Sequence, residues 1–564
     1  MPLTAQRPCP ADLENALLAA GFAPLQARIY AARGISQPAQ LEYDSTRLLP
    51  FTGLKNATAM AQLLADAIAA RKRILVVADY DADGATACVV ALRGLAWLGA
   101  DVDFIVPNRF EYGYGLTPEI VQLAHRQANP DILLTVDNGI ASVAGVEEAN
   151  RLGVQVLVTD HHLPGDTLPA AACIVNPNQP GCTFPSKHLA GVGVMFYVLL
   201  ALRAELRARC AFAERSEPNL GSLLDLVALG TVADVARLDD NNRILVHLGL
   251  QRIRSGRACP GINALLQIAR RAPSQAATYE LGFILGPRLN AAGRLDDMSL
   301  GIRCLLSDDE TAALRLAQQL DTLNHERKSI ESDMQESALA TLENFDPGDH
   351  YTLTLFDESW HQGVIGILAS RLKDRFHRPV VVFARSKEGE LKGSGRSIDG
   401  LHLRDTLDLV AKSHPHVLQK FGGHAMAAGV TVREEHLATF QHAFELATRT
   451  QVTPAQLVKT LETDGELPAR DFSLATAQDL ARQVWGQGFP EPLFEGAFRV
   501  ISQRVVGEKH LKLRLAGTAG ELDAIRFFSS EPAPEEIHAV YSLSINEYNG
   551  RETLQLIVRH WQGE

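Results

Sequence analysis

Short apolar runs alternate with amphipathic stretches between residues 57 and 176. The runs predict buried strands at 74–78, 102–106, 132–136, 154–159 and 173–176. The amphipathic stretches predict helices near 85–99, 117–127 and 141–152, after an Ala-rich helix at 57–70. Strand–helix repeats of this length form parallel sheets with right-handed crossovers. This part of the chain is therefore predicted to be an α/β domain with a parallel sheet.

The pattern changes in the second half of the chain. Residues 308–343 contain neither Gly nor Pro and carry a heptad-like apolar stripe, which predicts one long helix between two domains. Strands at 351–356 and 379–384, with a helix after Gly363 between them, predict a second, smaller α/β domain. Alternating runs at 511–515, 539–543 and 554–558 predict the antiparallel strands of a small β-barrel.

These patterns divide the chain into five parts. We expect a helical lead-in at 1–45, a large α/β domain at 46–307, a connecting helix at 308–345, a second α/β domain at 346–450 and a β-barrel domain at 451–564. A chain of 564 residues is long enough for several domains that each bury a core.

Composition narrows the class of protein. With 46% hydrophobic and 21% charged residues, the chain is typical of soluble globular proteins. It has no apolar run of about 18 residues and no signal-peptide pattern, so we expect neither a membrane span nor export. Seven scattered cysteines without a Cys-x-x-Cys pair favour a reducing cytoplasm and argue against structural zinc. The net charge of −12 argues against a generally basic nucleic-acid binder, although a local basic groove or bound metal ions can reverse the field.

Three acids follow the first predicted strand at alternate positions: Asp79, Asp81 and Asp83. In an extended backbone alternate side chains point to one side, so we expect the three carboxylates to converge. Like charges about 5 Å apart repel by roughly 3 kcal/mol at an effective dielectric near 20, which a bound cation would relieve. Oxygen ligands favour Mg²⁺ or Mn²⁺. The alternative is an acidic surface turn.

Polar residues also follow two other predicted strands. Asp137 comes after the strand at 132–136, and Asp160, His161 and His162 come after the strand at 154–159. Carboxyl ends of parallel strands meet at one edge of a sheet, where such folds place their sites. Either motif alone could be a simple turn, but together with the first three acids they predict a metal centre.

Two motifs in the next segment have less certain roles. Asp234 follows an apolar helical run beside Gly230 and could supply a further carboxylate or cap the helix. Gly191-Val192-Gly193 is half of a dinucleotide-binding fingerprint, but the third glycine is missing. We therefore interpret this glycine pair as a helix-packing feature.

Three segments suit phosphate binding. A predicted loop at 286–294 brings Arg288, Asn290 and Arg294 together, as in a phosphate clamp, unless these are surface arginines on a turn. Two glycine-rich loops, 393–397 and 421–424, carry an arginine and a histidine, respectively, and could also be plain turns. If the Ala-rich stretch at 425–429 is helical, its first amides would bind an anion. Basic residues at 499–514 fit single-strand binding by the barrel, although such barrels also dock proteins.

As an ordered set, these motifs resemble the DHH phosphoesterase superfamily, and most closely its branch of RecJ-type single-strand-specific 5′→3′ exonucleases. The resemblance extends from about residue 45 to the C-terminus and rests on Asp79-Tyr-Asp-Ala-Asp83-Gly84, Asp137-Asn-Gly, Asp160-His-His, Gly230-Thr-Val-Ala-Asp234, residues 286–294 and Gly422-Gly-His. It implies a parallel-sheet DHH catalytic domain, a connecting helix, a smaller DHHA1-like α/β domain that binds substrate, and a C-terminal OB-like barrel that binds nucleic acid.

The resemblance also implies roles for individual residues. One or two Mn²⁺ or Mg²⁺ ions would be held by Asp79, Asp81, Asp83, Asp137, His161 and Asp234. Catalysis would be in-line attack of water on the 5′-terminal phosphodiester, with His162 donating to the phosphate or leaving oxygen and Asp160 orienting a histidine. The DNA strand would pass Arg109, Arg288, Asn290, Arg294, Ser394, Arg396, Ser397, Gly422, Gly423 and His424. Tyr114 would stack on a base or serve in ordinary packing.

The expected function is metal-dependent degradation of single-stranded DNA to mononucleotides in recombination and repair. The resemblance implies single-stranded DNA-binding protein and a RecQ-type helicase as partners, a monomeric state, and a cytoplasmic, nucleoid-associated location in bacteria. One alternative is a DHH phosphodiesterase or phosphatase acting on short oligonucleotides or nucleotides. The other is a catalytically inactive replication scaffold, which would be expected to lack some of the metal carboxylates.

Overall fold

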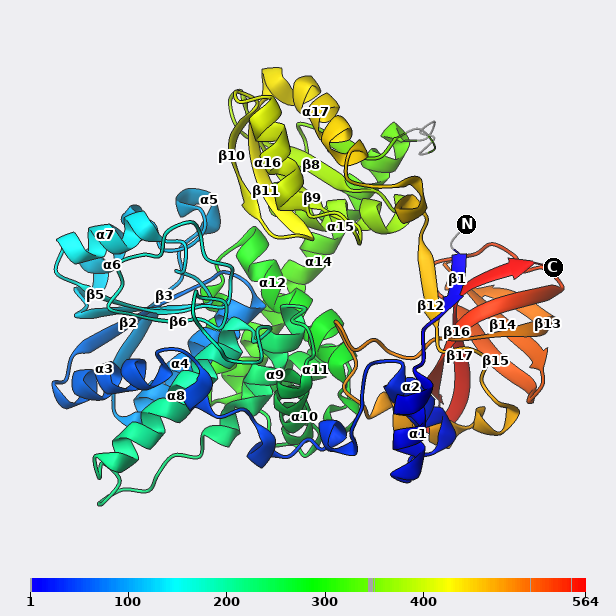
Figure 1. Ribbon diagram of the computed structural model, residues 1–564, viewed down its shortest axis with the longest axis horizontal. Helices are drawn as coiled ribbons and strands as arrows, with labels where there is room; N and C mark the ends of the chain where they lie inside the picture. The colour runs from blue at the N-terminus through cyan, green and yellow to red at the C-terminus, as the bar shows by residue number, and fades with distance from the viewer. Residues whose placement is uncertain (1–2, 343–347, 349, 508, 549, 564) are drawn as a thin grey trace. The chain divides into compact units, whose positions relative to one another are not determined.

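The computed structural model describes residues 3–342, 348, 350–507, 509–548 and 550–563, without the side chains of residues 109 and 110. The chain forms two compact units, and each is described by itself. The larger comprises residues 4–290, 298–318 and 462–564; the smaller comprises residues 1–3, 291–297 and 319–461. Figure 1 labels the helices and strands of both units.

A five-stranded parallel sheet forms the centre of the first α/β domain, as predicted. Its order is β3-β2-β4-β5-β6, with β2 at Arg73–Ala78, β3 at Asp101–Ile105, β4 at Ile132–Val136, β5 at Gln155–Thr159 and β6 at Cys173–Val175. All five strands lie within one residue of their predicted bounds. The inner strands are mostly apolar because helices cover both of their faces.

Helices on the two faces of this sheet bury its side chains. One face packs against α6 (Pro118–Ala128) and α7 (Val143–Arg151), whose Ile120, Val121 and Val146 join the sheet residues in one apolar cluster. The other face is covered by α3 (Ala57–Ala69), α4 (Ala82–Leu98) and α8 (Gly191–Ala208), as Figure 1 shows. This sandwich fixes the strand ends that carry the candidate site.

A helical region follows the sheet. It contains α9 at Leu224–Ala233, α10 at Asp240–Arg254, α11 at Pro260–Ile268, a π-helix at Glu280–Leu285, α12 at Gly286–Leu295 and α13 at Ser299–Leu306. The prediction of a loop at 286–294 is wrong, because α12 is helical throughout. Gly286 and Pro287 look like loop residues in the sequence, but α12 continues directly from the π-helix Glu280–Leu285, so a helical turn is already formed where the chain reaches them. The predicted long helix is α14, at Glu310–Thr341.

The smaller unit contains a mixed five-stranded sheet in the order β10-β11-β9-β8-β7. Its strands are β7 at Leu353–Phe356, β8 at Val380–Lys387, β9 at Glu390–Arg396, β10 at Leu418–Gly423 and β11 at Ala427–Arg433; its helices are α15 at Ile365–Phe376, α16 at Leu403–Ser413 and α17 at Leu437–Arg449. Only β7 and β8 are parallel.

Both glycine-rich segments of this unit are strands, so the predicted loops are wrong. Gly393 and Gly395 lie in β9, paired with Val430 and Ala428 of β11. A Cβ on Gly393 would lie 2.5 Å from the Phe383 ring, so the glycine allows close sheet packing. The stretch at 425–429, whose first amides would bind an anion if it were helical, is not a helix. From Ala427 on it belongs to β11, where the β-branched Val430-Thr431-Val432 favours a strand.

The C-terminal region closes into a five-stranded barrel, as predicted. Its order is β13-β14-β15-β17-β16, with β13 at Phe494–Val506, β14 at His510–Gly517, β15 at Gly520–Arg526, β16 at Glu536–Tyr548 and β17 at Arg551–Gly563. The lead-in contains α1 at Ala11–Ala19 and α2 at Pro24–Ala31, but it begins with a strand, β1 at Leu3–Gln6, that the local pattern did not predict. This strand forms because it pairs with β12, at Thr460–Thr463, far along the chain.

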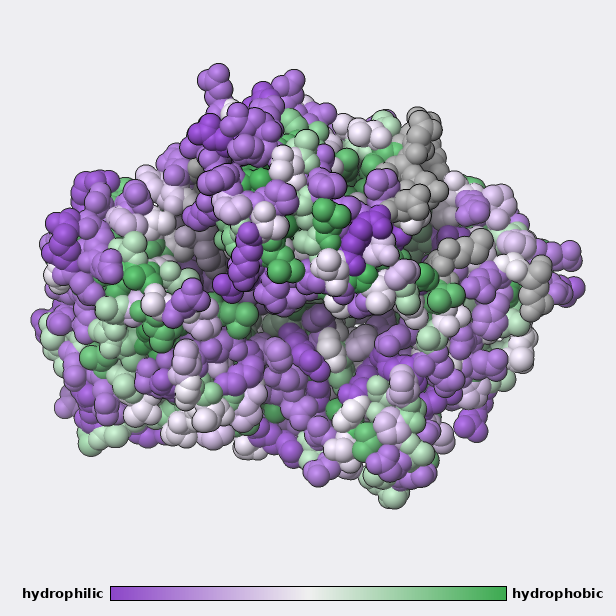
Figure 2. Space-filling view, turned by 45° about the horizontal axis from the view of Figure 1, so that its top comes forward, coloured by the Kyte–Doolittle hydropathy of each residue, from purple (hydrophilic) through white to green (hydrophobic). Residues whose placement is uncertain are grey.

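Hydrophilic side chains cover most of the face shown in Figure 2, with hydrophobic ones scattered among them. Among the helices of the described residues, none has both the length and the apolar character needed to cross a membrane.

Candidate metal centre and strand-binding residues

Three neighbouring strands of the parallel sheet end in acids at the same edge. Asp79 follows β2, Asp137 follows β4 and Asp160 follows β5, and the three side chains are at most 5% exposed. Since β2, β4 and β5 are adjacent in the sheet, their carboxyl ends bring these acids together. The structure thus assembles residues from three separate motifs, as the sequence pattern indicated.

The acids that follow β2 converge by a different route from the one predicted. The backbone does not stay extended: Asp81 caps α4 by accepting a hydrogen bond from Gly84 N at 3.0 Å, and Asp83 lies in the first helical turn. The Oδ1 of Asn290 accepts a hydrogen bond from Ala82 N at 2.8 Å and holds this turn. Convergence therefore comes from a tight strand-to-helix turn and not from alternation along a strand.

The start of α8 holds Asp83 in place. Gly191 N donates to its Oδ2 at 2.6 Å, and Val192 N donates to its Oδ1 at 2.9 Å. A Cβ on Gly191 would lie 2.5 Å from Asp137 Oδ1, so only glycine lets the helix approach both acids. The Gly191-Val192-Gly193 motif is thus a helix-packing motif, as interpreted from the sequence, but one that also positions the acid cluster.

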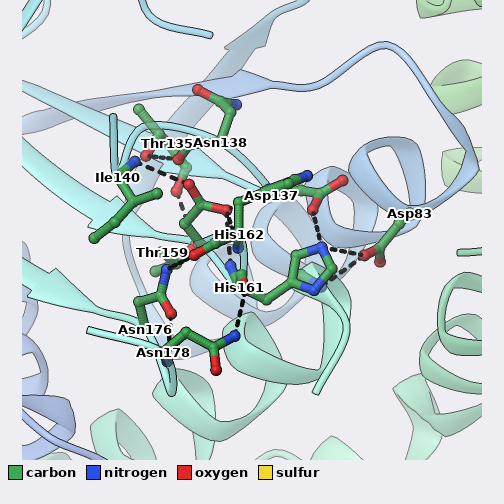
Figure 3. Close-up of polar contacts among 12 residues, drawn as sticks. Asp83, Thr135, Asp137, Asn138, Ile140, Thr159, His161, His162, Asn176 and Asn178 are labelled. Atoms are coloured by element: carbon green, nitrogen blue, oxygen red, sulfur yellow. Dashed lines mark hydrogen bonds and ion pairs between the residues drawn. The ribbon is translucent and has the colours of Figure 1, made fainter. Parts of the chain in front are cut away.

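The ligand-type atoms gather in three overlapping groups of three, and one of them, Asp137–His161–His162, shares a residue with each of the other two. Asp79, Asp81 and Asp137 have carboxylate oxygens within 4.8 Å of one another, and so do ligand atoms of Asp83, His161 and Asp234. These two groups meet where His161 Nε2 lies 3.1 Å from Asp137 Oδ1 (Figure 3). The same nitrogen lies 3.9 Å from carboxylate oxygens of Asp83 and of Asp234, so Asp234 at the end of α9 belongs to the cluster.

Burial and mutual repulsion disfavour ionisation of these acids. Burial, reinforced by Asp81, raises the pKa of Asp83 to about 7. Burial and the neighbouring carboxylates also raise the pKa values of Asp137 and Asp234 well above their usual range. A bound divalent cation would instead lower these pKa values and favour the ionised carboxylates. A buried donor set of carboxylate oxygens with one imidazole fits Mn²⁺ or Mg²⁺.

Asp160 belongs to none of the ligand groups found among the described residues and instead organises the histidine loop. Its Oδ1 accepts hydrogen bonds from His161 N at 2.7 Å and His162 N at 3.1 Å, and lies 2.7 Å from His162 Nδ1 (Figure 3). Its Oδ2 accepts from Ile140 N at 2.9 Å. Burial alone would raise the pKa of Asp160, but His162 lowers it to about 2.

His162 is held between Asp160 and Tyr114. Burial works against a charged imidazole, but the Asp160 carboxylate outweighs it and raises the pKa of His162 to about 9. The hydroxyl of Tyr114 lies 3.1 Å from His162 Nε2, and the Tyr114 side chain is 51% exposed. Tyr114 therefore lies at the entrance to the cluster, in contact with the second histidine.

Two asparagines that the sequence reasoning missed support both histidines. Asn176 Nδ2 donates to the carbonyl of His162 at 2.9 Å, and Asn178 Nδ2 donates to that of His161 at 2.6 Å (Figure 3). Both residues follow β6, so the search for polar residues at the ends of strands, which identified the other site residues, would also have identified these two. Behind Asp137, whose φ is +63°, Asn138 Nδ2 donates to Val77 O and Val136 O and ties two strand ends together.

The residues predicted to form a phosphate clamp do not form one within a loop. They lie on α12, where residues two apart do not face each other, so the helix separates Arg288 from Asn290. Arg288 is 9% exposed and donates to Ile284 O at 2.7 Å, while Asn290 faces the acidic turn. Arg294 lies near the end of α12. Arg109 is in the helix Arg109–Tyr112, and its side chain lies outside the described residues.

Arg396 ends β9, and its guanidinium lies beside the start of α15 in the smaller unit. Its Nη1 donates to Gly395 O at 2.8 Å and Ser394 Oγ at 3.2 Å, and a Cβ on Gly366 would lie 3.0 Å from its Nη2. Burial lowers its pKa, and none of the ion pairs in the described part of the chain involves it. A partly buried guanidinium beside a helix N-terminus suits an anion.

The other predicted phosphate ligands of this unit have structural contacts. Ser397 is buried and donates to Leu401 O at 2.8 Å, so its hydroxyl already has an acceptor. Gly422 and Gly423 end β10, and Gly423 has a φ of +143° that L side chains rarely adopt. His424 N donates to Ala427 O at 2.8 Å and closes the β10–β11 hairpin.

Comparison with known proteins places each region beside a defined family. The DHH family N-terminal domain matches residues 73–231, the DHHA1 domain matches 348–450, and the RecJ OB domain matches 463–560. The chain is 49% identical to the single-stranded-DNA-specific exonuclease RecJ of Salmonella typhimurium, over 97% of each chain, and equally similar to that of Escherichia coli.

Solved structures show the same likeness. The structure of RecJ in complex with Mn²⁺ from Thermus thermophilus aligns with a TM-score of 0.82 and 31% identity, over 100% of this chain and 79% of that one. A structure of exonuclease RecJ bound to manganese aligns with a TM-score of 0.60 and 36% identity, over 72% of this chain and 98% of that one.

Proposed function

The chain belongs to the RecJ family of single-stranded-DNA-specific exonucleases, and from this we propose that it removes nucleotides from the 5′ end of single-stranded DNA with divalent ions held at the acid cluster. The observation that carries this proposal is the pair of acid groups, Asp79–Asp81–Asp137 and Asp83–His161–Asp234, which meet at a 3.1 Å contact. Two adjacent groups of this kind suit two ions, one bound in each group, with Asp137 next to both.

The chemistry of the site follows from these donors. Mn²⁺ or Mg²⁺ bound there would acidify a water molecule and neutralise the charge that develops on the phosphodiester. Asp83 is fixed by two α8 amides and Asp81 by its own helix cap, so the carboxylates are positioned before substrate binds. Preorganisation of this kind means that little reorganisation is needed during hydrolysis.

His162 is the residue we assign to the reacting phosphate. Asp160 fixes its Nδ1 side at 2.7 Å, so Nε2, beside the hydroxyl of Tyr114, is the atom that would donate to the phosphate or to the leaving oxygen. Asp160 acts through His162 and the backbone amides of its loop, as a positioning residue.

The strand itself would be held by cationic groups in both α/β domains. We assign phosphate contacts to Arg288 and Arg294 on α12 and to Arg396 with Ser394 on β9, and we keep Arg109 and His424 as further candidates. In this proposal residues 46–307 are the catalytic domain, while 346–450 and 451–564 bind the strand. Contacts with single-stranded DNA-binding protein and a RecQ-type helicase, and a nucleoid-associated location, stay predictions.

The experiment that tests the function uses one oligonucleotide, labelled at its 5′ end or at its 3′ end. With Mn²⁺, we expect the 5′ label to appear at once as a mononucleotide and the 3′ label to stay on a shortening strand; EDTA should stop both. Release of the 3′ label first would contradict the polarity. Turnover of dinucleotides at the rate of long strands would instead favour a phosphodiesterase of short substrates.

A further inference from the structure

Two exposed aromatic rings stand just before the helix that carries Arg288 and Asn290. Tyr279 is 53% exposed and Phe283 is 72% exposed. The two rings stack on each other, with centroids 5.3 Å apart and planes at 29°. Large aromatic side chains usually contribute to a core, so a stacked pair left on the surface indicates a binding surface.

The backbone that presents these rings is unusual and firmly held. Phe283 lies in the six-residue π-helix Glu280–Leu285, and π-helical turns are rare and occur frequently at functional sites. Leu281 and Leu285 of the same segment are fully buried. Gly282 and Gly286 pack against the end of α9, since a Cβ on them would lie 3.2 Å from Val232 and 3.1 Å from Ala233. The two rings thus lie on the exposed side of this segment, while its buried side packs against the last residues of α9, directly before Asp234.

The aromatic pair lies close to the candidate metal centre. From Phe283 to Asn290 the helix advances roughly 10 Å, and Asn290 is hydrogen-bonded to the acidic turn. Val235, the residue after Asp234, is 64% exposed and has a φ of +60°, which is rare for a β-branched residue. The pair is therefore within the length of a few nucleotides from the acid cluster, in the same compact unit.

Charged groups near the start of the π-helix are compatible with a nucleic-acid strand. Arg254 donates to Ala276 O at 2.7 Å and to Arg482 O at 3.4 Å, which brings two arginines beside this segment. Glu280 is the acid that faces Arg254 there. Gln275 of the same segment donates to Glu547 at 3.3 Å, so guanidiniums and carboxylates both lie near the exposed rings, and the guanidiniums are available to a phosphate.

We propose that Tyr279 and Phe283 form a stacking platform for the bases of the strand that enters the metal centre. This inference rests on the proposed function and adds a base-recognition site to it. Every base offers a flat face, so the platform accepts any sequence, but only where the bases are unstacked and unpaired. It therefore favours single strands over duplexes at the point where the chain approaches the acids.

The test is a double-perturbation cycle on enzyme and substrate. A single abasic residue is moved through the first five positions of a 5′-phosphorylated oligonucleotide, and KM and kcat are measured for the wild type and for Phe283→Ala. Loss of one stacked base costs about 1–3 kcal/mol, which is about a 5- to 150-fold rise in KM. We expect that rise in the wild type at one or two positions. Phe283→Ala should show the raised KM on every oligonucleotide. The abasic residue should then have no further effect on KM at those positions.

A direct readout accompanies the kinetics. In the Asp81→Ala background, 2-aminopurine at the sensitive position should lose fluorescence on binding, and Phe283→Ala or Tyr279→Ala should abolish that loss. Phe283→Trp, which keeps an aromatic face, should restore it. Leu18→Ala removes a 38% exposed apolar side chain from α1 and should leave KM unchanged.

The outcomes separate this inference from the function it rests on. If the wild type digests the oligonucleotide and Phe283→Ala has the same KM and the same fluorescence change, the platform is overturned while the exonuclease stands. If the effects of Phe283→Ala and of the abasic residue multiply at every position, the two do not touch and the inference is also overturned. If the wild type releases no mononucleotide, the proposed function fails first.

Discussion

At the scale of single residues, the site depends on buried acids that destabilise one another. Asp137 shows this most clearly, because the residue is 1% exposed, its backbone is left-handed and its Oδ1 lies 3.1 Å from His161 Nε2. Such an arrangement is costly without a cation and favourable with one. Stability and metal binding should therefore change in opposite directions when this charge is removed.

Asp137→Asn tests whether stability and metal binding change in opposite directions. Asn tolerates a positive φ and keeps the shape of the side chain, so the fold should persist. We expect hydrolysis to fall by about 10²-fold or more. Without metal, the melting temperature of the variant should equal or exceed that of the wild type. Mn²⁺ at 100 times its dissociation constant stabilises the wild type by about 2.7 kcal/mol, but it should no longer raise the melting temperature of the variant. A variant still stabilised by Mn²⁺ would contradict the role of Asp137.

Asn178 provides a residue-scale test of positioning. Its hydrogen bond reaches the backbone of a proposed ligand, since its Nδ2 donates to the carbonyl of His161 at 2.6 Å. Residues that orient metal ligands in this way typically change metal affinity or activity by about 10- to 100-fold. We expect Asn178→Ala to raise the Mn²⁺ concentration needed for half-maximal activity by such a factor.

The control for Asn178→Ala is Asn150→Ala. Asn150 makes the same kind of bond, from Nδ2 to Ala170 O at 3.0 Å, away from the acid groups. Its loss should leave the Mn²⁺ dependence unchanged, and calorimetric titration of Mn²⁺ gives a readout independent of turnover. Equal effects of the two substitutions on the Mn²⁺ dependence would show that Asn178 contributes only to the general stability of the fold.

At the scale of elements, helix ends bring the acids together. Asp81 starts α4, Asp234 ends α9, and the first amides of α8 bind Asp83. Glycines make these close approaches possible: a Cβ on Gly230 would lie 2.9 Å from Asp83 Oδ1, and one on Gly191 would lie 2.5 Å from Asp137 Oδ1. The helix ends thus define the spacing of the two ligand groups.

Gly191→Ala should disturb this spacing. Overpacking a tight contact typically costs about 1–3 kcal/mol of unfolding free energy, and here the displaced group is a ligand carboxylate. We expect a large loss of kcat and of Mn²⁺ affinity. Gly193→Ala is the matched control two residues along α8, because its Cβ would meet only Leu189, at 3.2 Å. Similar kcat values for both variants would show that α8 does not position the acids.

Arg396→Ala tests the anion site at the start of α15. A hydrogen bond to a charged group contributes about 1.5–3 kcal/mol, so KM for 5′-phosphorylated single strands should rise about 10- to 100-fold with a smaller change in kcat. Arg385→Ala is the control, because Arg385 is already paired with Glu358 and Glu434. An unchanged KM for Arg396→Ala would remove this residue from the strand path.

The success of sequence reasoning differed between elements for physical reasons. The strands of the parallel sheet were predictable because buried parallel strands are continuous apolar runs bounded by turns, and their ends located Asp137 and Asp160. The helix α12 and the strand β9 were not, since glycines and arginines look like loop residues until a packing partner is known. Gly393, for example, is explained by Phe383 across the sheet, and β1 by a partner near residue 460.

At the scale of the whole molecule, the chain combines one metal centre with several surfaces that suit single-stranded nucleic acid. The parallel-sheet domain holds the acids, the smaller unit offers Arg396, and the closed barrel has the OB architecture of single-strand binders. Stacking on aromatic rings and contacts with phosphates accept any base, so we expect activity to depend on strand state and free ends, not on sequence.

The most direct test of this account compares three forms of one sequence: a linear 5′-phosphorylated single strand, a circular single strand and a blunt duplex. With Mn²⁺ the wild type should convert the linear strand to mononucleotides and leave the circle and the duplex intact. Asp81→Ala should bind the linear strand and release nothing. Cleavage of the circle, equal digestion of the duplex, or mononucleotide release by Asp81→Ala would contradict a metal-dependent exonuclease built on this acid cluster.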